Sequence, residues 1–330
     1  MINMKKVAED AGVSVSTVSR VLSGSDCVKE KTRLKVLEAA NRLNFQPNIL
    51  AQGLKLGYTS TIALMVPSIE NQIFPVIARG VEDVARKNGF TVILCNTDED
   101  MKVEKEYITK LKTRWIDGFI VASMLPDSDH IRALCAENFP VVLVCRYYDE
   151  SISAVAIDNY HAAYDAVCHL IKSGHKRIAF ASGRLELSFY QKRYQGYLDA
   201  LKDHGLAVEP KLIMHETNGS QSFYYLTQQL LKEEPGIDAV FASSDPKAIV
   251  VMRAIQDLGL RIPEDISVMG FDNIGMSNLV EPPLSTVSQP LYEIGALAAK
   301  KLIRMIKGNG STKPVIDFLK TDLIIRKSTR

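Results

Sequence analysis

The stretch VAEDAGVSVSTVSRVL, residues 7–22, contains two short helical patterns on either side of a glycine. Asn3, a good N-cap residue, precedes the first pattern, and Gly12 tolerates the positive φ that a sharp turn requires. Ser14 is placed to cap the second helix, over 15–22. The inward face of the two helices would consist of Val7, Ala8, Ala11, Val18, Val21 and Leu22. The pattern predicts a helix-turn-helix unit.

A third helical pattern, over 31–43, completes this small unit. Two helices of this length bury too little apolar surface to be stable by themselves. We expect the third helix to cover them with Leu34, Leu37, Ala40 and Leu43.

The outward face of the second helix carries short polar side chains and one arginine. It consists of Val15, Ser16, Ser19 and Arg20. In helix-turn-helix proteins the N-terminal part of this helix enters the major groove of DNA. Arg20 would donate two hydrogen bonds to guanine, Ser16 would contact either base, and Val15 would touch a thymine methyl. Ser14 and Thr17 would bind phosphates. The alternative is a generic three-helix cap with a solvated polar face.

The distribution of charge agrees with a polyanionic partner at one end of the chain. Residues 1–58 hold nine Lys and Arg against five Asp and Glu, a net charge of +4. The whole chain carries +2, so the remainder carries −2. A basic segment joined to a slightly acidic body is typical of nucleic-acid binding by that segment.

Between Pro47 and Gly57 lies a short helical pattern that Gly53 weakens. A helix this short is not stable in water without a partner. From the residues alone, the segment is therefore interpreted as a flexible linker.

From residue 61 onward, short apolar runs alternate with amphipathic helical stretches. The runs are 61–67, 91–95, 118–122, 141–145, 154–157, 177–181, 212–215, 239–242 and 266–270. Continuously apolar runs between helices are typical of parallel strands buried on both faces. Nine strands would form one large sheet or two smaller ones. We favour two doubly wound sheets, with a break near Asp158 and Asn159 and crossovers near 287–290. The fold class is α/β, with a ligand cleft at the carboxyl ends of the strands.

Several classes of protein are disfavoured. No apolar run approaches the roughly 18 residues that span a bilayer, and the N-terminus lacks the apolar core of a secretory signal. We therefore expect a cytoplasmic protein. The five cysteines are scattered and fit small buried hydrophobes better than disulfides or zinc ligands. His161, His169 and His175 are interpreted as surface histidines because their spacing places no metal pair on one helix face. No nucleotide fingerprint or nucleophile motif occurs, so we expect no enzyme, no cofactor and no metal.

Charged residues follow several of the apolar runs. Arg146 ends the fourth run, Asp245 and Asp272 follow the last two, and Arg193 lies in a helical stretch containing Gly196. Arginine presents a planar fork of donors and a carboxylate accepts from vicinal hydroxyls, so together they suit a polyol. The alternative is that these charges pair with each other or cap helices, which fits Asp245 best.

The stretch at 7–22, with Lys31-Thr32-Arg33, Lys35-Val36 and Pro47-Asn48, resembles the signature of the lactose-repressor (LacI/GalR) family. The resemblance extends over essentially the whole chain. It implies a helix-turn-helix DNA-binding domain at 1–46, a hinge at 47–58 and an effector-binding and dimerisation domain of periplasmic-binding-protein type at 59–330. Within the last, the N-subdomain would comprise about 59–159 and 290–321, and the C-subdomain about 160–289 and 322–330.

The resemblance also implies residue roles. Leu54 matches the hinge leucine that wedges into the minor groove, with Asn48, Ala51, Gln52 and Lys55 beside it. Arg193 matches the effector-binding arginine and Asp272 the aspartate of the G-[FY]-D motif. Four other residues are expected in the pocket: Ile73 and Phe74 at its entry, and Ser123 and Met124 on its floor. Asn218 falls where several members carry an aromatic that stacks on a sugar, which weakens transfer of a particular sugar.

These observations predict a transcription regulator, most simply a repressor, whose operator affinity is controlled by a small ligand of carbohydrate type. A closing cleft would shift the hinge segments and so couple the ligand to DNA. Residues 321–330 resemble a final strand and a short basic tail with no leucine-repeat helix. We therefore expect a homodimer on a palindromic double-stranded operator. The alternative function is a sugar-binding protein without a DNA role.

Overall fold

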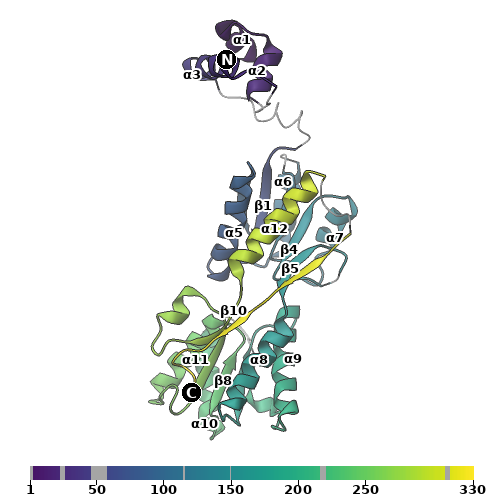
Figure 1. Ribbon diagram of the computed structural model, residues 1–330. Helices are drawn as coiled ribbons and strands as arrows, with labels where there is room; N and C mark the ends of the chain where they lie inside the picture. Colours follow the sequence, from purple (N-terminus) through teal and green to yellow (C-terminus); the bar gives the residue numbers. More distant parts are fainter. Residues whose placement is uncertain are drawn as a thin grey trace. The chain divides into compact units, whose positions relative to one another are not determined.

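The computed structural model describes residues 3–22, 27–45, 58–113, 116–148, 150–215, 221–308 and 313–330. By their internal contacts these residues form two compact units, Met1–Ser60 and Thr61–Arg330 (Figure 1).

The N-terminal unit consists of three helices, α1 (Met4–Ala11), α2 (Val15–Leu22) and α3 (Glu30–Arg42). The Asn3 side chain caps α1 by accepting from the Lys6 amide, and Gly12 ends it in the left-handed conformation with φ 66°. The helix-turn-helix prediction is confirmed in both the caps and the turn.

The third helix uses a different face from the one expected. The buried core of the unit consists of Val7, Ala8, Val18, Val21, Val36, Ala39 and Ala40, with Leu43 packed against it. Leu34 and Leu37 are instead 52% and 41% exposed. The expected lid was wrong at these two leucines, because the face with the small side chains of Ala39 and Ala40 lets α3 approach the other helices closely.

The second unit contains two six-stranded sheets. The first has the strand order β11-β5-β4-β3-β1-β2, and its pairings are parallel. Its strands are β1 (Thr61–Val66), β2 (Thr91–Asn96), β3 (Gly118–Val121), β4 (Val141–Val144), β5 (Ala154–Ile157) and β11 (Ile316–Leu319). We call this sheet and its covering helices the N-subdomain.

The second sheet has the order β12-β10-β9-β8-β6-β7, parallel except for β12. Its strands are β6 (Ile178–Ser182), β7 (Ile213–His215), β8 (Ala239–Ala242), β9 (Ser267–Asp272), β10 (Ser285–Ser288) and β12 (Asp322–Ile324). This sheet and its helices form the C-subdomain. The nine apolar runs all contain strands, and the prediction of two doubly wound sheets is confirmed.

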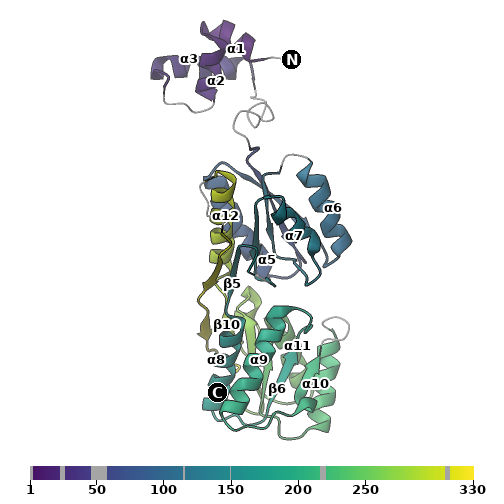
Figure 2. The ribbon, with the colours of Figure 1, turned by 90° about the vertical axis from the view of Figure 1, so that its right-hand side faces the viewer.

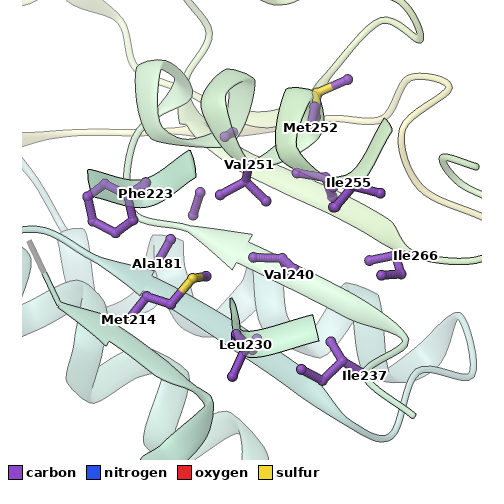
Figure 3. Close-up of a cluster of buried hydrophobic side chains, with 14 of the residues drawn as sticks. Ala181, Met214, Phe223, Leu230, Ile237, Val240, Val251, Met252, Ile255 and Ile266 are labelled. Atoms are coloured by element: carbon purple, nitrogen blue, oxygen red, sulfur yellow. The ribbon is translucent and has the colours of Figure 1, made fainter. Parts of the chain in front are cut away.

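Helices cover both faces of each sheet, as the continuously apolar strands require (Figures 1 and 2). In the N-subdomain α5 (Ile73–Lys87) and α12 (Leu291–Ile306) lie side by side, with α6 (Met101–Lys112) and α7 (Asp129–Ala136) on the other face. In the C-subdomain α8 (Asn159–Lys172) and α9 (Ser188–Asp203) cover one face. On the other face α10 (Gln221–Glu233) and α11 (Asp245–Asp257) enclose a core that includes Phe223, Val240 and Val251 (Figure 3).

Glycines let two of these helix pairs cross at backbone distance. A Cβ at Gly80 of α5 would lie 2.1 Å from the Tyr292 carbonyl oxygen of α12, and one at Gly295 would lie 2.1 Å from the Ile77 oxygen. A Cβ at Gly196 of α9 would lie 2.4 Å from the Tyr160 oxygen of α8. These contacts hold the two helices of each pair in close backbone contact.

The chain passes three times between the subdomains: between β5 and α8, between β10 and α12, and between β11 and β12. The final residues are not a loose basic tail. Ser328 and Thr329 are buried, and the Ser328 hydroxyl donates to the Val268 carbonyl at 2.6 Å and accepts from the Ser285 amide at 2.7 Å. The C-terminal segment is therefore part of the C-subdomain core.

Candidate functional site

The outward face of α2 is polar and accessible. Val15 is 44% exposed, and Ser16 and Arg20 are exposed beside it. The hydroxyl of Ser14 accepts from the Thr17 amide at 3.2 Å and lies 2.8 Å from the hydroxyls of both Ser16 and Thr17. This cap fixes the first turn of α2, from which the expected base-reading side chains project. Ser19 is half-buried on the same helix.

A pocket of about 700 Å³ lies at the carboxyl ends of the strands of the second unit, within the range of small-molecule sites. Both subdomains contribute to it. Ile73, Phe74, Glu99, Cys145 and Arg146 line it from the N-subdomain. The C-subdomain supplies Asn159, Arg184, Phe189, Tyr190, Arg193, Lys247 and Asp272.

Arg193 is held rigidly in this pocket. Its Nε donates to the Asn159 side-chain oxygen at 2.8 Å and its Nη1 to the Ser243 carbonyl at 2.6 Å. Its guanidinium carbon lies 3.5 Å from the centroid of the Phe271 ring, a favourable cation–π arrangement. Burial lowers the pKa of Arg193, but the group stays charged at any physiological pH. The side chain is thus pre-organised, which lowers the entropic cost of using it to bind a ligand.

Asp272 ends β9 and faces Arg193. Its Oδ1 accepts from Gln289 Nε2 at 2.6 Å and lies 3.5 Å from Arg193 Nη1. Burial raises the pKa of Asp272 to about 7, against the opposing effect of the Arg193 charge. Its φ of 123° departs from ordinary strand values and belongs to the region that favours glycine. Backbone strain and a perturbed pKa in a cleft are typical of residues at functional sites.

A second group of charges lies on the other side of the pocket. Arg146 is buried, and its Nη2 donates to Glu99 Oε1 at 2.6 Å. Arg184, which follows β6, forms an ion pair with the same Glu99 carboxylate. The Arg146 guanidinium also lies 5.4 Å from the centroid of Phe189. One carboxylate therefore binds two guanidiniums, one from each subdomain.

Comparisons with known proteins identify the chain. Residues 3–48 match the family "Bacterial regulatory proteins, lacI family", and residues 59–322 match "Periplasmic binding proteins and sugar binding domain of LacI family". The chain belongs to the LacI family. It is 36% identical to the ribose operon repressor of Halalkalibacterium halodurans, over 100% of this chain and 98% of the relative.

Two solved structures of the LacI family extend the comparison. The lac repressor dimer bound to operator and the anti-inducer ONPF is 28% identical with a TM-score of 0.88, covering 99% of both chains. A LacI-family regulator from Enterococcus faecium with bound ribose is 30% identical with a TM-score of 0.72, covering 82% of this chain and 98% of that one. The chain is thus a DNA-binding transcription repressor with a sugar-binding domain, and not an enzyme.

The LacI-family pocket brings together five of the residues expected from the sequence: Ile73, Phe74, Arg146, Arg193 and Asp272. Asn218 and the hinge residues Asn48, Ala51, Gln52, Leu54 and Lys55 lie outside the described residues. Their roles stay predictions.

Three expected pocket residues do not line it. Ser123 donates its hydroxyl to the buried Glu104, which also lies 2.5 Å from His130 Nε2. Met124 is fully buried in the core between the first sheet and helices α6 and α7. These two side chains point into the N-subdomain, because a strand-end position fixes the edge of the sheet but not the direction of the side chain.

Asp245 is the third. Its carboxylate accepts from the hydroxyls of Ser277 at 2.5 Å and Thr286 at 2.6 Å, and from the Ile274 amide at 3.0 Å. With three partners in the C-subdomain it cross-links β10 and the segment after β9. Asp245 is thus a structural residue of the C-subdomain, but through these contacts rather than through the ion pair or helix cap of the stated alternative, since the N-cap of α11 is Ser244.

His175 is 1% exposed rather than a surface residue. Among the residues that the structure describes, no group of three or more His, Cys, Asp or Glu side chains is arranged to hold a metal ion. In the same part of the chain, no helix has the length and apolar character needed to cross a membrane.

Sequence reasoning missed Glu99, Arg184, Lys247 and the aromatic pair Phe189–Tyr190. Glu99 and Arg184 follow β2 and β6, so the rule that selected Arg146 also selects them. The other three lie inside α9 and α11, where one turn of a helix faces the cleft, and periodicity does not distinguish that turn from a solvated one.

Proposed function

We propose that this repressor acts as a homodimer on a palindromic operator. Its affinity for the operator falls or rises when a carbohydrate binds in the pocket between the subdomains. The observation that carries the proposal is the pre-organised pair of Arg193 and Asp272, a donor fork and an acceptor carboxylate at the strand ends of the pocket. The ribose bound by one solved relative and the operator bound by another support the two halves of the proposal.

At the DNA end, Val15, Ser16 and Arg20 would read bases while Ser14, Thr17 and Ser19 contact phosphates. Leu54 of the expected hinge would wedge into the minor groove. We place the domain boundaries at 46 and 58, as the sequence predicts, and the protein in the cytoplasm, where its DNA is.

The ligand would act by changing the relative populations of two arrangements of the subdomains. The change in operator affinity is limited by the difference between the ligand's affinities for the two arrangements. Arg146 and Arg193 come from opposite subdomains. The affinity for a ligand that contacts both therefore depends on the distance between the subdomains.

The test is operator binding by fluorescence anisotropy at fixed salt, on palindromic probes from the chain's own upstream region, with and without sugars. Arg20→Ala should weaken operator binding by about 10-fold or more, the value of one bidentate base contact, and leave sugar binding unchanged. Arg193→Ala should leave operator binding intact and abolish the response to sugar.

Glu106→Gln, on the exposed face of α6, is the matched control. It removes one surface charge that belongs neither to the DNA-binding face nor to the pocket. The proposal fails if no palindromic probe is retained above non-specific DNA. It also fails if Arg193→Ala responds to sugar like the unaltered chain.

A further inference from the structure

We infer that the effector of this pocket is an anionic carbohydrate, such as a sugar phosphate or sugar acid, and that Glu99 occupies the place of its charged group until it binds. The inference deepens the proposed function and rests on it, since it concerns the same pocket. It follows from the arrangement of three charged side chains.

The Glu99 carboxylate lies between two arginines. Arg146 follows β4 of the N-subdomain and donates to it at 2.6 Å, and Arg184 follows β6 of the C-subdomain and is ion-paired to it. Two guanidiniums converging on one set of acidic oxygens is the geometry with which proteins bind phosphate and carboxylate ligands. Here the chain supplies the anion itself.

The other acids that line the pocket have different partners. Asp272 lies against Arg193 and Gln289, and Asp98 accepts from the Asn96 amide at 2.6 Å. The walls hold four cations, Arg146, Arg184, Arg193 and Lys247, and three acids. Withdrawal of Glu99 would therefore leave a strongly cationic half of the pocket.

Arg146 makes that half suited to an anion. Only 5% of the residue is exposed, and its Nη1 is buried and hydrogen-bonds to no group among the described residues. A buried guanidinium is costly unless it is paired and hydrogen-bonded. A phosphate has more acceptor oxygens than the single Glu99 carboxylate and would satisfy the Arg146–Arg184 pair more completely.

The backbone of Glu99 favours its release. Asp98 and Glu99 are consecutive residues in the left-handed region, with φ 50° and 57°, which costs free energy for residues that have a Cβ. The two arginine contacts offset that cost. When a ligand anion replaces Glu99 as the partner of the arginines, the loop between β2 and α6 is free to relax. The exchange therefore costs little free energy.

A neutral sugar would behave in the opposite way. A hydroxyl does not replace a full charge between two guanidiniums, so Glu99 would remain in place and act as a hydroxyl acceptor. The sign of the effect of removing the Glu99 charge therefore distinguishes the two classes of ligand.

The first experiment compares matched ligands on the full chain by isothermal titration calorimetry. The pairs are D-ribose with D-ribose 5-phosphate and D-glucose with D-glucose 6-phosphate, with D-gluconate as a sugar acid and inorganic phosphate as the charge alone. We expect the charged member of a pair to bind at least about 10-fold tighter, as one charge-assisted contact provides. Its affinity should fall as salt rises. Equal or tighter binding of the neutral members overturns the inference, as does the absence of binding by every charged probe.

The second experiment uses isosteric variants. Glu99→Gln should tighten the binding of the charged sugars and of inorganic phosphate by about threefold to tenfold, since it removes the competing carboxylate. It should not tighten the binding of the neutral sugars. Arg184→Gln should abolish the preference for charge, and Glu106→Gln should change nothing. Weaker binding of both classes by Glu99→Gln overturns the inference.

Operator binding separates this inference from the proposed function. If a neutral sugar binds and alters operator affinity while charged sugars do not, the function stands and the inference fails. If charged sugars bind as expected but never alter operator affinity, the inference stands and the proposed control of DNA binding fails.

Discussion

Among single residues, Asp272 shows most directly how the pocket is maintained at the expense of stability. Burial disfavours its charged form more strongly than Arg193 favours it, so its pKa is raised to about 7. In the unfolded chain the same carboxyl titrates near its ordinary value of about 3.9. Between these values the unfolded chain holds fewer protons, so this group lowers the stability of the folded chain as pH rises from about 4 to about 7.

Asp272→Asn removes this titration. We expect the melting temperature of the variant, relative to the unaltered chain, to be higher at pH 8 than at pH 5, by an amount worth up to a few kcal/mol. Calorimetry without ligand at both pH values measures the change. Asp265→Asn is the control: its half-buried carboxylate has its pKa lowered to about 2 by Arg261, so it titrates in neither state between pH 5 and 8. An equal difference at both pH values would contradict the expectation.

The sequence identified those pocket residues that end apolar runs or match the family motif. Arg146 and Asp272 were found because the edge where parallel strands end is predictable from the chain alone. Ser123 and Met124 obey the same rule yet point into the core. The same rule selects Glu99 and Arg184, but their pairing joins residues 85 positions apart, and only the fold establishes that proximity.

Among the elements, the pair α5 and α12 determines the geometry of the N-subdomain. The two helices lie near the start and near the end of the sequence of the second unit. Their backbones are in contact at Gly80 and Gly295. Close packing of this kind leaves no room for an added methyl.

Gly80→Ala should therefore destabilise the second unit by about 1–3 kcal/mol or more, although alanine favours helices, because a Cβ there would overlap the Tyr292 carbonyl. Urea unfolding of the two proteins measures the loss. Gly275→Ala is the matched control, since its φ is ordinary and its Cβ would meet nothing within 4 Å. A Gly80→Ala variant as stable as the control would show that the helices separate without cost.

Some elements could not be predicted from apolar runs. β10 is polar in sequence, although Ser285 and Thr286 are fully buried, because each hydroxyl has a partner: Ser285 pairs with the Thr329 hydroxyl, and Thr286 donates to the Asp245 carboxylate. β11 is an edge strand with partly exposed side chains, and its sequence lacks the signal of a strand buried on both faces. The buried face of α3 was misassigned because the prediction placed its leucines in the core. Short helices that approach closely instead bury small side chains such as alanine.

For the whole molecule, each unit has its own hydrophobic core. Units with separate cores unfold separately. Differential scanning calorimetry of the full chain should show two transitions. A fragment of residues 58–330 should retain the larger one within about 2 °C, a shift that corresponds to about 1 kcal/mol for a unit of this size. Loss of the larger transition in the fragment would show that the N-terminal unit stabilises the second.

The three passages between the subdomains have a consequence for the order in which the chain is made. The helix-turn-helix unit is complete once residue 45 has been synthesised, and five strands of the first sheet by residue 157. Both sheets then wait for the last fifteen residues, because β11 closes one, β12 closes the other, and Ser328 enters the core after them. The DNA-binding unit is thus synthesised long before the sugar-binding domain is complete, and a premature stop near the end would remove strands from both subdomains while leaving the helix-turn-helix unit intact.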